Sequence, residues 1–170
     1  MKISMKLNSA SIQQAVSQVR EYQKDLEAKT DRLRERVAEE LARLCEEGFN
    51  GAGYDDILLE GMRVPNVDVT VEKDGKITLV IAHGKEAVFA EFGAGVYYNP
   101  GGSPNPLTAP GVVAIGTYGK GYGARKVWGY YEEGKLKLTH GTPASMPMYH
   151  AIQEVAKRLP DIAKEVFSEG

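Results

Sequence analysis

The sequence contains a single cysteine, Cys45, which excludes an internal disulfide framework. Its formal net charge is only −2, so no strong field draws the chain to nucleic acid or to an anionic membrane. No apolar run approaches the roughly 20 residues that span a bilayer, and the opening "MKISMKLNSAS" lacks the apolar core of a signal peptide. Apolar and charged residues make up 42% and 26% of the chain, as in ordinary globular proteins. We expect a single domain over residues 1–170, made and used in a cytoplasm.

The first third of the chain has the apolar spacing of a helix. After "MKISMKL", which alternates like a short strand, a helical segment is predicted over 8–47, either continuous or broken into a pair near Thr30. Gly48 suits the position just after its end. Residues 20–47 carry 16 charges of both signs, which is typical of a solvated face and compatible with an interaction role. The apolar stripe consists of Ile12, Val16, Val19, Tyr22, Leu26, Leu33, Val37, Leu41 and Leu44.

Two hairpins and a final helix are predicted in the rest of the chain. Alternating apolar residues on both sides of "KDGK" indicate a first hairpin, which belongs with the following "EFGAG" element to the stretch 64–92. A second hairpin turns at "EEGK" within 126–139. The C-terminal helix is expected over 143–168, with a kink or restart at Pro160. Together these elements predict an α+β fold, in which an antiparallel sheet of hairpins packs against the long N-terminal helix, or helix pair, and the C-terminal helix.

Residues 93–124 form a long arm that is rich in glycine, proline and tyrosine. Its "GTYGKGYG" stretch (116–123) resembles a phosphate-binding loop, but the spacing of the glycines and lysine fits neither the P-loop nor the dinucleotide motif, and a strand follows instead of a helix. Glycine also serves a chain that changes shape. We therefore expect a flexible arm that contributes little to the core and is ordered by a partner, and we expect no bound cofactor or nucleotide.

Candidate catalytic chemistry is sparse. Cys45 lies beside the apolar stripe and is expected to be a buried thiol, and Glu91 is expected to have a structural role. A small hydrolase that uses Glu91 or Cys45 stays open as an alternative. The three histidines lack the spacing of a metal site, so no metal is expected. Lys120, Arg125 and Lys126 are too few for a nucleic-acid footprint, although contact with DNA inside an assembly stays open.

Four motifs in order carry a resemblance to a known family. "AVFAEFGAG", the tyrosine- and glycine-rich arm, the "KVWGYY" hairpin and "HGTPASMPMYHAI" resemble the tail-component family of long-tailed bacteriophages and prophages. These are head–tail joining, or tail-completion, proteins of the virion neck, and the order of motifs is followed from about residue 10 to 168. The sequence departs from the family at Ala94, where threonine is common.

The resemblance implies a virion protein without catalytic activity, made in the bacterial cytoplasm and located in the neck or tail. It implies a homo-oligomeric ring, expected to be hexameric in the virion and compatible with a monomer in isolation. The other partners would be phage neck and tail-tube proteins, with passing contact to DNA in the channel and no membrane. A tail terminator and a head-closure protein stay open as alternatives. The expected partner-binding residues are Tyr97, Tyr98, Tyr118, Lys120, Tyr122, Arg125 and Trp128.

Overall fold

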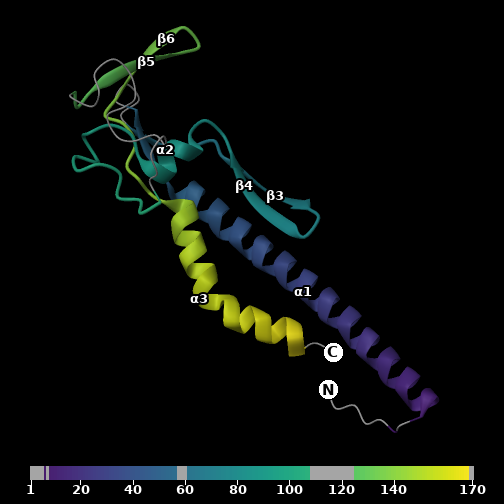
Figure 1. Cartoon of the computed structure of the whole chain (residues 1–170). Helices are drawn as coiled ribbons and strands as arrows, with labels where there is room; N and C mark the ends of the chain where they lie inside the picture. Colours follow the sequence, from purple (N-terminus) through teal and green to yellow (C-terminus); the bar gives the residue numbers. More distant parts are fainter. Residues whose placement is uncertain (1–5, 7, 57–60, 108–124, 169–170) are drawn as a thin grey trace. The chain divides into compact units, whose positions relative to one another are not determined.

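The computed structural model describes residues 6, 8–56, 61–107 and 125–168, and it has the mixed helix and strand content of an α+β protein. Its helices are α1 (Ser9–Gly51), α2 (Ala87–Phe92) and α3 (Pro147–Ser168). Among the described residues the strands form three separate antiparallel pairs, where one sheet of hairpins was expected. Figure 1 shows two of them, β3–β4 and β5–β6. The pairs are β1 (Tyr54–Asp56) with β2 (Gly61–Arg63), β3 (Asp68–Asp74) with β4 (Ile77–His83), and β5 (Trp128–Glu132) with β6 (Lys135–Thr139).

The chain divides into two compact units. One contains Met1–Val37 and Arg158–Gly170, and the other contains Ala38–Lys157. The expected strand at the N-terminus lies outside the described residues, apart from Lys6. The single α+β domain over 1–170 stays a prediction. Within the described ranges, none of the helices offers an 18-residue window apolar enough for a bilayer.

The helical segment predicted over 8–47 is one continuous helix of 43 residues. The side chain of Asn8 accepts a hydrogen bond from the Ser11 N–H at 2.9 Å and so caps its first turn. There is no break at Thr30. Its hydroxyl donates to the Leu26 carbonyl at 2.7 Å, one turn back in the same helix, so it does not act as the N-cap of a second helix.

Gly48 does not end the helix, which continues to Gly51. A Cβ atom on Gly48 would lie 2.8 Å from the Cβ of Pro147, at the start of α3. The glycine therefore allows α3 to approach the α1 backbone closely, and the expectation that it marks the helix end was wrong.

Both predicted hairpins are confirmed. In the first, Asp74 pairs with Ile77, so the loop is Gly75-Lys76. This register places Val69 and Val71 opposite Ala82 and Val80, and it leaves Ile77 (58% exposed) on the other face. In the second, Glu133 and Gly134 both have positive φ (51° and 76°), as a tight hairpin turn requires.

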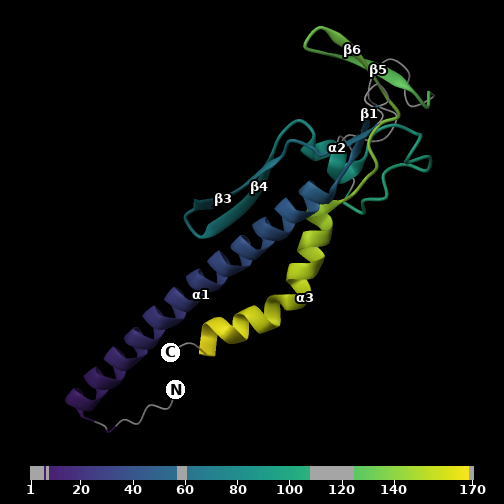
Figure 2. The same ribbon diagram turned by 180° about the vertical axis from the view of Figure 1, so that it is seen from behind.

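The core of the second unit is built largely from small side chains. Phe49 and Cys45 are its largest fully buried residues, and they pack with Val69 of β3. The small members of the cluster are Ala42, Ala52, Ala87, Ala90 and Ala151. Alanine at these positions lets α1, α2 and α3 pack closely, and Figures 1 and 2 both show α2 beside the start of α3.

In the first unit, the apolar stripe of α1 is only partly covered. Ala15 of α1 and Ile162 and Val166 of α3 are buried, and Arg36 pairs with Glu165 at 3.8 Å. α3 continues through Pro160 without ending there. By contrast, the stripe residues of the first turns of α1 are 41–51% exposed: Ile12, Val16, Val19, Tyr22 and Leu26.

Candidate functional site

Two of the motifs that carry the family resemblance are bonded to each other. α2 ends at Phe92, and Ala94 then forms a two-way backbone bridge with Thr142, in which each N–H donates to the other's carbonyl at 2.9 Å. Alanine suffices at position 94 because the bridge uses backbone atoms alone. The carbonyl of Ala90 also accepts hydrogen bonds from the N–H groups of Ser145 and Met146. The "EFGAG" and "HGTPASMPM" segments thus form one structural unit, which we call the motif junction.

Glu91 is the side chain at the centre of the motif junction. It is only 6% exposed, and its carboxylate accepts the N–H of Met148 at 2.8 Å and the N–H of Tyr149 at 3.1 Å. These N–H groups belong to the first turn of α3, where no carbonyl of the same helix is available to them. The carboxylate is therefore the N-terminal cap of α3, and its charge complements the helix dipole.

Two buried asparagines attach the first part of the predicted arm to this junction. Asn105 donates from its amide to Glu91 Oε1 at 2.7 Å, and Asn99 donates to the Thr142 carbonyl at 3.0 Å. Asn99 also accepts the Ala144 N–H at 3.3 Å. The arm was expected to contribute little to the core. These contacts contradict that expectation for the residues up to Leu107, because buried amides that replace water with protein partners stabilise the fold.

The glycines of the junction allow close backbone contact. Gly141 has φ of 105°, and a Cβ there would lie 2.1 Å from the Ala94 carbonyl oxygen. Gly95 has φ of 78°, and a Cβ there would lie 2.8 Å from the His140 carbonyl oxygen and 3.3 Å from Trp128 Nε1. Any side chain at either position would force the two motifs apart.

The predicted partner-binding residues fall into three groups. Tyr97 and Tyr98 are exposed (48% and 37%), their rings are 4.9 Å apart, and Tyr97 stacks on His140 at 4.3 Å. Trp128 is half-buried, and its indole nitrogen would lie 3.3 Å from a Cβ atom built on Gly95. Arg125 is exposed. Tyr118, Lys120, Tyr122 and the "GTYGKGYG" stretch lie outside the described residues.

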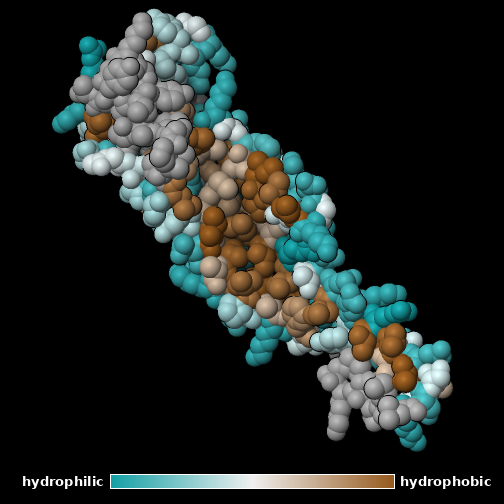
Figure 3. All heavy atoms as spheres, in the orientation of Figure 1, coloured by the Kyte–Doolittle hydropathy of each residue, from teal (hydrophilic) through white to brown (hydrophobic). Residues whose placement is uncertain are grey.

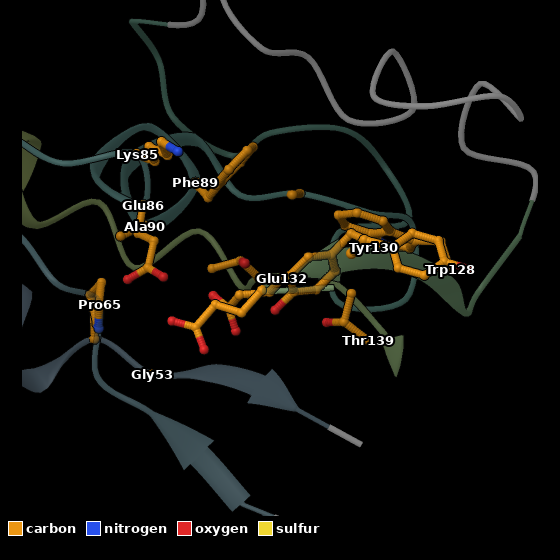
Figure 4. A pocket seen from close by; sticks show the side chains of 15 residues that line it. Gly53, Pro65, Lys85, Glu86, Phe89, Ala90, Trp128, Tyr130, Glu132 and Thr139 are labelled. Atoms are coloured by element: carbon orange, nitrogen blue, oxygen red, sulfur yellow. The ribbon is translucent and has the colours of Figure 1, made fainter. Parts of the chain in front are cut away.

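A cavity of about 570 Å³ opens beside Trp128. Figure 4 shows Trp128 and Tyr130 of the second hairpin on one side, with Glu86 and Phe89 around α2 on the other. The full lining is Ala52, Gly53, Pro65, Lys85, Glu86, Phe89, Ala90, Ala94, Trp128, Tyr130, Tyr131, Glu132, Glu133, Thr139 and Thr142. Its volume lies in the range of ligand pockets.

This cavity was not predicted from the sequence. Trp128, Tyr130 and Glu132 alternate along β5 and are the half-buried positions of that strand, so their shared face was readable from the sequence. The opposite wall was not readable, because Phe89 and Glu86 reach it only through the tertiary fold.

The two candidate catalytic residues are both engaged in the core. Cys45 is fully buried, and burial, together with the carboxylates of Glu91 and Glu46, raises the pKa of its thiol to about 11. A thiol that stays protonated at neutral pH is a poor nucleophile. The Glu91 carboxylate accepts hydrogen bonds from Asn105, Met148 and Tyr149, which agrees with the structural role expected for this residue.

Two of the histidines have identified local partners. His83 shares a hydrogen bond of 2.8 Å with the Thr70 hydroxyl across the first hairpin, and His140 stacks on Tyr97. Over the part of the chain that the structure describes, no group of three or more histidine, cysteine or acidic side chains is arranged to hold a metal ion.

Comparisons with protein-family models, with curated proteins and with solved structures found no match to this chain.

Proposed function

We propose that the chain is a structural virion protein of a phage or prophage, which joins the head to the tail by forming a ring through protein–protein contacts. The observation that supports this proposal best is the exposed apolar stripe on the first turns of α1. Apolar side chains aligned on one helix face and left 41–51% exposed are typical of a surface that a partner covers. Figure 3 shows apolar side chains gathered near the N-terminal end of α1, at the lower right.

The proposed ring would be built from one contact repeated between neighbouring subunits. A patch on one subunit that binds a different patch on the next generates a closed ring when the rotation closes. We propose six subunits in the virion, with neck and tail-tube proteins above and below. The exposed Tyr97 and Tyr98 would serve as anchors, since tyrosine is favoured at protein interfaces. The expectation that a partner orders a flexible segment stays part of this proposal only for the residues after Leu107.

A tail terminator or a head-closure protein of the same neck region is the second candidate, because both share ring geometry. The hydrolase alternative has less support: the buried thiol of Cys45 and the capped carboxylate of Glu91 are needed by the fold. Replacing either residue should lower the stability of the protein, and it should not abolish any hydrolytic activity. An activity abolished by Cys45→Ser in a folded protein would restore the enzyme hypothesis.

Particle imaging tests the proposal directly. Particles assembled without this chain should accumulate as filled heads beside unattached tails, whereas a tail terminator would give tails of irregular length. A pair of helix variants then tests the stripe: Val19→Asp places a charge in it, and Ser17→Asp places the same charge on the opposite face of α1. We expect Val19→Asp to reduce tailed particles at least about tenfold, with Ser17→Asp near wild type. Equal effects of the two variants, or attached tails in the absence of the chain, would reject the proposal.

A further inference from the structure

The cavity beside Trp128 combines an aromatic wall with acidic side chains. Phe89, Trp128 and Tyr130 line it, and the rings of Trp128 and Tyr130 lie 6.0 Å apart with an interplanar angle of 46°. The two rings are therefore tilted toward each other and not stacked in parallel. Ring faces attract cations through their quadrupole, and tryptophan does so most strongly.

The charges around the cavity favour a cationic occupant. Three carboxylates line it, those of Glu86, Glu132 and Glu133, against a single ammonium group, that of Lys85. Glu86 accepts the Asn66 N–H at 2.6 Å, which holds this carboxylate in place. A carboxylate has about four acceptor sites, so this bond is compatible with a second donor from a ligand.

The second hairpin adds lysines close to this surface. In its register, Lys137 lies opposite Tyr130 and Lys135 lies opposite Glu132. Neither lysine lines the cavity. The lining itself therefore contains three carboxylates and one ammonium group.

We propose that this cavity binds an arginine-bearing segment of a partner protein. The guanidinium plane would stack against Trp128 and Tyr130, and its donors would reach the carboxylates of Glu86 and Glu132. Arginine fits better than lysine because its planar, weakly hydrated head both stacks on aromatic rings and forms paired hydrogen bonds with carboxylates. Its aliphatic stem would lie along the apolar part of the wall formed by Phe89 and Pro65.

This inference deepens the proposed function by naming the chemistry of one contact. It rests on the proposed function only in assigning the arginine to a neck or tail protein. Its test uses the purified full chain, so it can fail while the particle experiment succeeds, and the reverse is equally possible.

Trp128 provides the probe, because it is the only tryptophan in the chain and gives a single indole N–H resonance. N-acetyl-arginine-N-methylamide should shift this resonance saturably, with a dissociation constant on the order of millimolar. The citrulline analogue has nearly the same shape without the charge, and it should bind at least about fivefold more weakly. The comparison needs no variant and is decisive on its own.

A pair of charge variants locates the binding. The double variant E132Q/E133Q should weaken arginine binding about tenfold, and E72Q, on the exposed face of β3, should leave it within about twofold of wild type. A dispersed amide spectrum checks that each variant is folded. Equal binding of arginine and citrulline, unchanged affinity in E132Q/E133Q, or no saturable shift up to about 50 mM would overturn the proposal.

Discussion

Replacing Glu91 should destabilise the second unit more than any other single carboxylate change in the described part of the chain. Its carboxylate receives the Met148 N–H at 2.8 Å, the Tyr149 N–H at 3.1 Å and the Asn105 amide at 2.7 Å. In Glu91→Ala these three donors lose their acceptor in a buried or half-buried setting. A lost hydrogen bond to a charged group costs about 1.5–3 kcal/mol, and water that enters the gap recovers part of the sum. We expect the free energy of unfolding to fall by about 3–5 kcal/mol, which is a large share of the roughly 5–15 kcal/mol of a typical domain.

Glu91→Gln separates the hydrogen bonds from the charge. The amide oxygen can still accept from one side, but the amide nitrogen would face a donor where a carboxylate oxygen stood. We expect an intermediate loss of about 1–3 kcal/mol. Glu72→Gln is the matched control, because Glu72 is exposed on β3, and it should change stability by less than about 0.5 kcal/mol.

Urea titration followed by Trp128 fluorescence measures these changes, since Trp128 and Glu91 belong to the same compact unit. Hydrogen exchange adds a local test: the amides of Met148 and Tyr149 should lose protection in Glu91→Ala before the rest of α3 does. If Glu91→Ala and Glu72→Gln were equally stable, the carboxylate would not be the cap of α3 and the reasoning would be refuted.

Three further predictions concern the same unit. The pKa of the Cys45 thiol is 9.0 in the unfolded chain and about 11 in the folded protein, so the unfolded state loses this proton first as the pH rises. Raising the pH from 9 to 11 should therefore lower the free energy of unfolding by about 2–3 kcal/mol. In Cys45→Ala this part of the pH dependence should be absent from the measured profile. Gly48→Ala should cost about 1–3 kcal/mol through its clash with Pro147, whereas Gly51→Ala, with open space around it, should be neutral or slightly stabilising in thermal melts. Asn105→Ala should cost about 1–3 kcal/mol, and a double-mutant cycle with the capping carboxylate should show coupling; additive losses would mean that the amide acts elsewhere.

Much of the secondary structure was readable from local patterns. The hairpins over 68–83 and 128–139 follow from alternation and turn residues, and the long helix follows from its apolar spacing. The start of α3 was not readable in this way. Helix formation was expected from residue 143, but Thr142 is held in the bridge to Ala94 and the cap of the helix comes from Glu91. A cap that is supplied from a distant part of the chain leaves no local signal.

The role of Gly48 and the order of the segment before Leu107 also depend on contacts with distant parts of the chain. Gly48 has the local signature of a helix end, yet its role is set by Pro147, which is distant in sequence. The prolines and glycines before Leu107 indicated a loose segment, whereas Asn99 and Asn105 hold it through bonds that composition does not reveal. The β1–β2 pair was also missed, because each of its strands has only three residues and so carries little pattern.

The capping bond of α3 has a consequence for the order in which the protein folds. Glu91 and Met148 are 57 residues apart in sequence, so the acceptor is made long before its donors. While a ribosome is still synthesising the segment between them, the carboxylate has only water and nearby groups as partners, and the alanine-lined core around α2 lacks its last helix. Contacts that close such long loops slow folding. Nascent chains halted before residue 149 should therefore stay sensitive to protease, and native resistance should appear only once α3 has left the exit tunnel.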